Sequence, residues 1–280
     1  MTSRSTLSKK TSDYLKVFNA AADELEPRFR SNWSRALNQW RNDPTMTKAM
    51  RDLVAGRITP VSFATRVGTV LETLPQSLRS GLNVVQLRGL NIQNNIMGVD
   101  KIKNAGEWAE RYGAERIYGI TNASRDAINS FVSGAITEGM PVSELASHIG
   151  DVLGTDQRFA RAALNYRNSM LAVGTKPARV QTLTRDYVRR AASQRAKTIA
   201  RTETMSALAY GQRTALSVAS STGLLAADAR MVWIAAPGCC DRCTKLNGVT
   251  TGINGVWTIE GMQFDSPPMH PNCRCVIGVE

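Results

Sequence analysis

The sequence predicts an α+β protein that is mostly α, with a helical N-terminal region, a helical bundle and then a small antiparallel β unit. Up to about residue 220, apolar residues recur mainly every three or four positions, which is the period of an amphipathic helix. After Gly223 the pattern changes to short strand-like runs. All five cysteines and one of the two histidines follow residue 238, in two clusters whose spacing is typical of a metal site.

The bulk composition is that of a globular protein. A length of 280 residues is enough for one large domain or two small ones, and a hydrophobic content of 42% allows a substantial core. Residues 1–10 are polar, no secretory h-region follows them, and no apolar run approaches the length of a membrane span. We therefore expect a protein of the reducing cytoplasm with no membrane partner, where cysteines favour metal binding over disulfides.

The first long helix is predicted to begin at Ser12 or Asp13, either of which could cap it. Residues 1–11, rich in Ser, Thr and Lys, are predicted to be a disordered tail. Pro27 should kink or divide the helix. An apolar stripe runs along it, which indicates core or a helix–helix contact rather than a cofactor site. Its members are Tyr14, Phe18, Ala21, Leu25, Phe29, Trp33, Leu37 and Trp40.

The rest of the N-terminal region is predicted as shorter helices. One ends near Gly56 and another covers residues 61–74. In residues 76–120 several glycines interrupt a helix-compatible pattern, so we predict short helices joined by turns. A domain boundary near the end of that stretch gives a helical region over 12–118 and a second region over 119–280.

The second region is predicted to hold helices over 121–220 and a β unit over 228–280. The longest helix starts near Pro177. Three small residues near its end allow close helix packing: Ala207, Ala209 and Gly211. The strands are predicted at 231–234, 256–259 and 274–279. Asn247-Gly248 suits the left-handed angles of a type I′ hairpin turn.

The cysteine clusters predict a structural zinc site. A Cys-x2-Cys pair facing a His-x2-Cys pair offers four soft or borderline donors, at a spacing that lets a tight turn aim both at one ion. Cys240, Cys243 and His270 are the firm ligands. Cys273 and Cys275 compete for the fourth place, because alternate residues of a strand face the same way. The ion would join two turns of a unit that has little core of its own.

Other uses of these residues stay open. Free buried thiols rarely cluster, and a nucleophilic cysteine with His270 as its base would leave four cysteines without a role. A zinc deaminase needs His-x-Glu or Cys-x-Glu upstream of Pro-Cys-x-x-Cys, but Pro237 is one residue out of register and His148 precedes Ile149. Cys239 is surplus to four ligands. A site filled by protein donors has no place for water, which favours a structural role.

The net charge of +12 and a pI near 9.9 predict an acidic partner, either nucleic acid or a negative protein surface. Most of the excess lies between Arg158 and Arg201, where eleven cations accompany one carboxylate, Asp186. Such a helix could neutralise phosphates without sequence preference and with strong salt dependence. The alternative is a solvated face or pairing with an acidic protein. The candidate contact residues are Arg158, Arg161, Arg179, Arg185, Arg189, Arg190, Arg195 and Lys197.

Arg201 and Glu203 are predicted to be structural. An Arg and a Glu could serve nucleotide chemistry, but two residues apart on a helix they point to different sides. We expect each to make an ion pair or hydrogen bond with the β unit. We predict that the protein is not an enzyme and has no small-molecule substrate.

In their order, these motifs resemble the phage Mu F-like head-morphogenesis family, the minor head proteins. The resemblance covers roughly residues 120–280 and is carried by Arg201-Thr202-Glu203-Thr204, Gly211, the Trp233 strand, Cys240-x2-Cys243, Leu246-Asn247-Gly248 and the closing run from Pro267 to Cys275. The doubled Cys239-Cys240 departs from the family pattern. So does Ala236-Pro237-Gly238, which replaces the usual acidic-x-Arg lead-in.

The resemblance implies a minor capsid protein of the virion, present in low copy number, that acts in procapsid or head assembly. Its expected partners are the portal protein or the major capsid protein at the inner capsid surface, and packaged DNA is a further contact. It would lie in the host cytoplasm during assembly and then in the head interior or at the portal. The alternative is a zinc-containing nucleic-acid-binding protein or nuclease, although no carboxylate and histidine cluster suited to a two-metal nuclease is visible.

Overall fold

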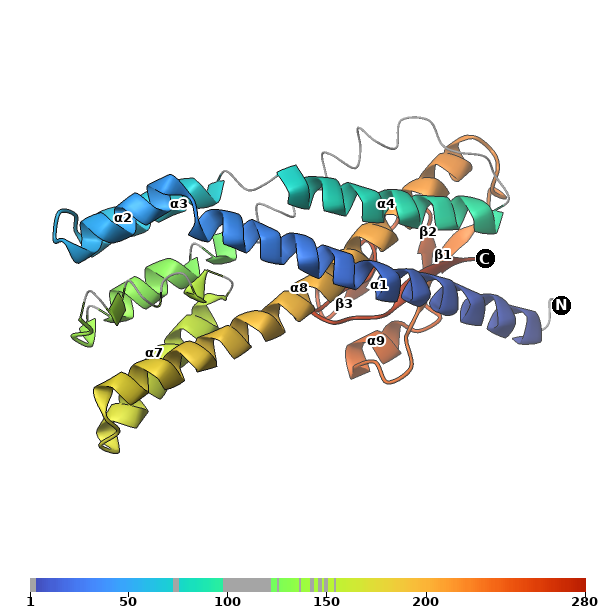
Figure 1. The fold of residues 1–280 in the computed structure, drawn as a ribbon. Coiled ribbons are helices and arrows are strands. Elements are labelled where there is room, and N and C mark those ends of the chain that lie inside the picture. The colour runs from blue at the N-terminus through green and yellow to red at the C-terminus, as the bar shows by residue number, and fades with distance from the viewer. Residues whose placement is uncertain are drawn as a thin grey trace. The chain divides into compact units, whose positions relative to one another are not determined.

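In a computed structural model of the chain, the described residues are 4–72, 76–97 and 122–280, apart from 125, 136, 142–143, 146–147, 149–150 and 154. Most of these residues are helical, and antiparallel strands gather near the C-terminus (Figure 1). The predicted fold class, α+β and mostly α, is confirmed. Within this described part, no helix is both long enough and apolar enough to cross a membrane.

The helices with defined bounds are α1 (Arg4–Arg41), α2 (Pro44–Val54), α3 (Pro60–Glu72), α4 (Gln76–Met97), α7 (Gln157–Ala172), α8 (Pro177–Ser221) and α9 (Asp241–Leu246). Further helical residues lie between 122 and 152. The strands are β1 (Arg230–Ile234), β2 (Thr250–Gly252), β3 (Trp257–Ile259), β4 (Met262–Phe264) and β5 (Val276–Val279).

The chain forms two compact units, and each is assembled from segments far apart in the sequence. Unit 1 contains Met1–Arg30, Arg79–Gly113 and Thr198–Glu280, and unit 2 contains Ser31–Leu78 and Ala114–Lys197. Helices α1 and α8 contribute residues to both units. This division differs from the predicted boundary at residue 118, which lies outside the described residues. Hydrophobic period shows where a helix lies, but it does not show which helices pack together.

Helix α1 carries the predicted apolar stripe, and all eight of its members are buried. The helix begins at Arg4, so the prediction of disorder over 1–11 is wrong from that residue onward. A polar sequence can extend a helix that is already nucleated, because each added residue gains one hydrogen bond. Pro27 does not divide α1. Burial of Leu25 and Phe29 on either side offsets the hydrogen bond that the proline removes.

Helix α4 corrects the prediction of short pieces over residues 76–97, which form one helix, whereas the rest of that predicted stretch, residues 98–120, lies outside the described residues. Gly89 explains why a glycine is tolerated there. A Cβ at this position would lie 2.2 Å from the carbonyl oxygen of Leu208 in α8, so only glycine lets the two helices approach so closely. The close helix packing expected near Ala207 and Ala209 is therefore present, and Gly89 of α4 is the residue that α8 packs against.

The β unit of unit 1 has a three-stranded sheet in the order β2-β1-β5 and a β3–β4 hairpin, all antiparallel. Strand β1 is central and four of its five residues are buried. The last strand begins at Val276 rather than at Arg274 as predicted. Asn247 and Gly248 do not form a type I′ hairpin, because Asn247 has a φ of −58° and ends helix α9, and only Gly248 has a positive φ.

A buried polar network runs through the core of unit 1. The Gln212 side-chain amide on α8 donates to the Gln93 side chain at 2.9 Å and to the Ile277 carbonyl of β5 at 2.6 Å. The Gln93 amide in turn lies 3.5 Å from the hydroxyl of Tyr14 on α1. Burial raises the pKa of Tyr14. Because buried amides cost free energy when they lack partners, this network ties α1, α4, α8 and β5 to one arrangement.

Candidate metal centre

The first two donors are held at the start of helix α9. Cys240 is its N-cap residue, and the carbonyl oxygen of Cys240 accepts the Thr244 N–H at 2.9 Å. Cys243 lies three residues further on, so one helical turn places both thiols on the same side. Gly238 turns the chain from β1 into this cap with a φ of 69°, a left-handed conformation that suits glycine.

The other donors lie on the loop that leads into β5. The Cys273 N–H donates to the His270 carbonyl oxygen at 3.2 Å, which closes a tight turn. Asn272 within that turn has a φ of 62°, and asparagine is one of the few residues that tolerate this region. The two residues between His270 and Cys273 therefore have the same purpose as the two between Cys240 and Cys243: they bend the backbone so that both donors face one point.

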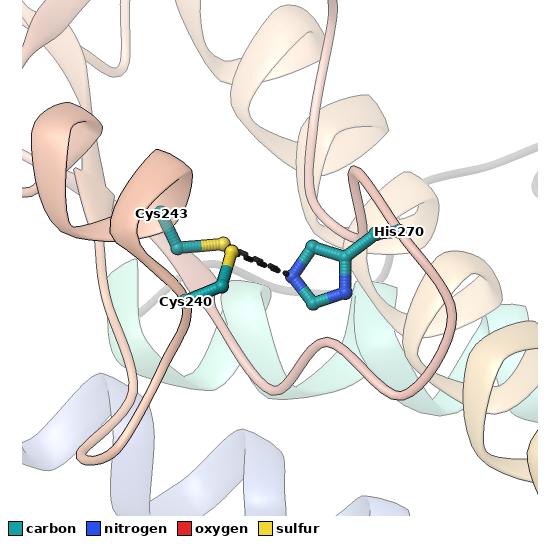
Figure 2. A group of neighbouring side chains, drawn as sticks. All are labelled: Cys240, Cys243 and His270. Atoms are coloured by element: carbon teal, nitrogen blue, oxygen red, sulfur yellow. Dashed lines mark hydrogen bonds between the residues drawn. The ribbon is translucent and has the colours of Figure 1, made fainter.

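The imidazole of His270 points at the two thiols of α9 (Figure 2). Its Nε2 atom lies 3.3 Å from Cys240 Sγ and 3.4 Å from Cys243 Sγ. Its Nδ1 atom lies 2.8 Å from the Pro271 carbonyl oxygen. A carbonyl oxygen can only accept, so Nδ1 carries the proton and Nε2 presents its lone pair to the thiols. This is the tautomer that a metal-ligating histidine needs.

Cys273 and Cys275 complete the cluster from the other side of Cys243. The Sγ atoms of Cys243 and Cys273 are 3.8 Å apart, and those of Cys243, Cys273 and Cys275 lie within 4.8 Å of one another. Cys240, Cys243 and His270 form an equally close set, and Cys243 belongs to both. All five predicted ligands are thus brought together, and the cluster could bind a metal ion.

Hydrogen bonds and burial shift the pKa values of the thiols in opposite directions. The hydrogen bond that Cys275 donates to Cys273 lowers the pKa of the Cys273 thiol to about 5. The same bond, seen from the donor, raises the pKa of Cys275, and burial adds to it. The Cys243 backbone N–H lowers the pKa of Cys240, whereas burial raises that of Cys243 itself. Metals bind thiolates rather than thiols. The lowered pKa values of Cys240 and Cys273 therefore favour the charged form that a metal cation needs.

Cys239 lies outside both sets, in agreement with its description as surplus. Its Sγ atom is 3.4 Å from the Thr244 hydroxyl, and it has no place among the metal-ligand groups of the described residues. Because it is adjacent to Cys240 but belongs to neither donor set, it offers a matched control for the ligand cysteines.

The cluster is continuous with the hydrophobic core of the β unit. Cys243, Cys273 and Cys275 are buried together with Trp233 and Trp257. The two indole rings meet edge to face, with centroids 5.4 Å apart. The exposed corner of the cluster is Cys240. An ion here would be shielded on the core side and would replace the protons of thiols that the core already surrounds.

Sequence reasoning missed Arg274 and Thr202. Arg274 stands between two predicted ligands and turns the opposite way, toward Asp23 at 2.8 Å and Glu26 at 3.0 Å on α1. Thr202 of α8 accepts the Asn272 N–H at 3.1 Å through its hydroxyl oxygen. Strand-like alternation after Cys273 could have indicated that Arg274 faces away from the metal, but it could not identify the partner.

The predicted structural residues Arg201 and Glu203 lie on α8 in unit 1. Arg201 pairs with Glu26 of α1 at 3.4 Å rather than with the β unit, so the expected contact is indirect: Glu26 is shared with Arg274. Glu203 is half-buried, and its structural role stays a prediction.

The eight cations predicted to meet an acidic partner divide into three groups. Arg195 and Arg189 of α8 are engaged within unit 2, with Asp156 at 2.7 Å and Asp151 at 3.3 Å. Arg161 donates to the Ser130 hydroxyl at 3.3 Å but stays exposed. The others have no ion pair among the described residues, and all but the half-buried Arg185 are exposed: Arg158, Arg179, Arg185, Arg190 and Lys197. The surface charge of this region is therefore smaller than the sequence count.

His148, the histidine outside the cysteine clusters, belongs to unit 2. It is fully buried, its ring meets that of Phe131 edge to face, and its Nε2 atom is 3.9 Å from a Glu144 carboxylate oxygen. Among the described residues it takes part in no metal-ligand group. The second histidine that a deaminase arrangement could have used is therefore a core residue.

The chain was compared with family models, curated proteins and solved structures. No family model, no curated protein and no solved structure matches the chain.

Proposed function

We propose that this chain is a structural minor head protein of a tailed phage, similar to the Mu F-like head-morphogenesis proteins, and that a zinc ion holds its C-terminal unit together. It acts in head assembly, at the portal or the inner capsid surface. The single observation that carries the proposal is a contact between two of the motifs that resemble the family. The Arg-Thr-Glu helix and the closing His-Pro-x-Cys-Arg-Cys run, which carry the resemblance in sequence, touch at the Thr202–Asn272 hydrogen bond.

Zinc is the metal that the donor set fits best. Three thiols and one imidazole make a Cys₃His set, one of the usual compositions of a closed structural zinc site. Zn–S and Zn–N bonds of about 2.3 and 2.0 Å put neighbouring ligands of a tetrahedron roughly 3.5–3.8 Å apart. The Nε2–Sγ distances of 3.3 and 3.4 Å and the Sγ–Sγ distance of 3.8 Å are close to that edge length.

Cys240, Cys243, His270 and Cys273 would hold the ion, with Cys275 behind them. The Cys275 Sγ atom accepts the Ala236 N–H at 3.5 Å, which suits a sulfur that supports the ligands from the backbone side. When bound, the ion supplies structural cross-linking, because four protein donors leave no position for water. The protein residues supply the rest: Pro271 fixes the imidazole tautomer and α9 fixes two thiols.

A binding role without head assembly is the alternative, and the exposed cations of α7 and α8 favour it. Arg158 and Arg161 on α7 and Arg179, Arg190 and Lys197 on α8 are all exposed. A nuclease is less well supported, since the two donor groups found among the described residues contain no carboxylate. Salt-sensitive DNA binding fits both the head protein and the free binder, so it does not distinguish them.

The test is to purify heads and portals from an infected host and to look for this chain in both, with zinc measured on the same fractions. We expect the chain to co-purify with the portal or the head, and to carry one zinc per chain. A Cys239→Ser variant should be incorporated normally, whereas Cys243→Ser should not. Absence of the chain from heads and portals would overturn the assembly role, and metal-dependent DNA cleavage lost in Cys243→Ser would establish a nuclease instead.

A further inference from the structure

The loop that carries His270, Cys273 and Cys275 also contacts α1, through Arg274. Arg274 lies between Cys273 and Cys275, and both neighbours belong to the metal cluster. Its guanidinium is 2.8 Å from Asp23 and 3.0 Å from Glu26. Its carbonyl oxygen accepts the Asn19 side-chain amide at 3.3 Å. One residue therefore joins the loop to α1 through both its side chain and its backbone.

On α1 the residues that contact Arg274 form a polar stripe, which is separate from the apolar stripe of the same helix. Asn19, Asp23 and Glu26 are spaced by four and three residues, so they share one face of the helix. Leu15, one turn before Asn19, packs against the hydrophobic core of the β unit. Glu26 is mostly buried, with 17% of its side chain exposed, and it is shared by Arg274 and Arg201. A shared carboxylate of this kind is sensitive to the position of either arginine.

The position of Arg274 depends on the geometry of the loop. The alternation that turns Cys273 and Cys275 toward the cluster turns Arg274 toward α1, so the two directions are fixed together. Within the loop the Cys273–His270 backbone bond is the local constraint, and the Asn272–Thr202 bond anchors the loop to α8. An ion that joins His270 and Cys273 of the loop to the two thiols of α9 would hold this backbone far more firmly.

We infer that metal loading of the cluster controls the docking of residues 15–26 of α1 on the β unit, with Arg274 as the coupling residue. This rests on the metal-binding part of the proposed function and not on the role in head assembly. With the ion bound, Arg274 is held where it meets Asp23 and Glu26. Without the ion, the loop relaxes and the N-terminal part of α1 detaches. The coupling is reciprocal, because a contact that stabilises the metal-bound loop also tightens metal binding.

Reciprocity gives the first test, which is Zn²⁺ affinity measured by competition with a chelator on the full chain. Glu26→Gln and Arg274→Gln should bind Zn²⁺ with unchanged stoichiometry but about 5-fold or more weakly. Matched controls are Glu24→Gln, on another face of α1 and paired with Arg28, and Arg230→Gln, at an arginine of β1 that donates to the Thr250 hydroxyl. Both controls should bind as the unaltered chain does. Equal affinity in all four variants would overturn the inference.

The second test follows detachment directly, by limited trypsin digestion after the exposed Lys16 and Arg28. Removal of Zn²⁺ should accelerate cleavage at these sites at least about tenfold, because proteolysis reports the population of the opened helix. Glu26→Gln should be cleaved faster even with Zn²⁺ present, and Glu24→Gln should not. Zn²⁺ binding without any change in cleavage would overturn this inference alone, whereas a chain that binds no Zn²⁺ would overturn the metal part of the proposed function as well.

Discussion

Unit 1 and unit 2 both assemble distant segments of the chain, but they use different interactions. In unit 1, a cluster of thiols and one imidazole, a buried amide network and a shared carboxylate connect helices to strands. In unit 2, apolar helices pack together, and α7 and α8 are tied to carboxylates by arginines, as in the pairs Arg167–Glu144 and Arg195–Asp156. Unit 1 therefore combines a donor cluster that could bind a metal with a few long-range polar contacts. Unit 2 depends on the burial of apolar side chains and on ion pairs, and single substitutions can test each of these.

The largest expected effect is loss of the metal from unit 1. Cys243→Ser removes the donor common to both halves of the cluster. Structural zinc contributes on the order of 10 kcal/mol of apparent folding free energy at neutral pH, so the β unit should lose its tertiary structure. The measurement is zinc content together with the near-ultraviolet dichroism of the Trp233–Trp257 pair. Cys239→Ser is the control, and equal behaviour of both variants would contradict the metal site.

The next effect belongs to unit 2 and tests its main ion pair. The Arg167 guanidinium makes two bonds to Glu144, at 2.7 and 3.0 Å, and its side chain is only 9% exposed. Arg167→Met leaves a partly buried carboxylate without this partner and should cost about 3 kcal/mol of unfolding free energy. Arg158→Met, at an exposed cation on the same helix, should cost nothing measurable. Urea unfolding of both variants decides, and a shift in the zinc affinity of Arg167→Met would show that the two units are not independent.

A smaller effect is expected where α4 and α8 approach each other in unit 1. Gly89→Ala places a methyl group against the Leu208 carbonyl and should cost about 1–3 kcal/mol, because backbone atoms cannot move aside as a flexible side chain can. Asn91→Ala, at an exposed position of the same helix, should be neutral or slightly stabilising. Thermal unfolding of the zinc-loaded chain is the readout. A stabilising Gly89→Ala would mean that the helices pack less closely than described.

The smallest effect is the pH dependence of unit 2. Burial lowers the pKa of His148 below its ordinary value of 6.5, although Glu144 and Asp151 oppose the shift and Arg185 and Arg167 reinforce it. The unfolded chain therefore takes up a proton at a higher pH than the folded chain does. Stability is complete above about pH 6.5 and falls as the pH drops below that value.

Hydrogen exchange of the α7 amides, corrected for its intrinsic pH dependence, measures this effect without interference from His270 in unit 1. His148→Phe should remove the loss of protection between pH 6.5 and pH 5, because phenylalanine fills the space beside Phe131 without titrating. A loss of protection that persists in His148→Phe would assign the pH dependence to another group.

The sequence predicted the parts that depend on local spacing. The α1 stripe, the position of the β unit and the five clustered donors all follow from residues a few positions apart, and the structure places them as expected. The sequence-based prediction was wrong where a glycine could have either of two structural roles. In α4, Gly89 is a packing residue rather than a break, and at Asn247-Gly248 the turn ends a helix rather than joining two strands. Only the neighbouring element distinguishes these cases.

By itself, the amino-acid order determined which residues could bind a metal and which helix faces are apolar, because donor spacing and hydrophobic period are properties of a few neighbouring positions. Only the tertiary structure decided that Arg274 meets α1, that Gln212 reaches both Gln93 and Ile277, and that Arg195 is occupied by Asp156. Those contacts join residues far apart in the chain. The free energy of these contacts depends on interatomic distance and on burial. Neither quantity follows from how far apart the residues are in the sequence.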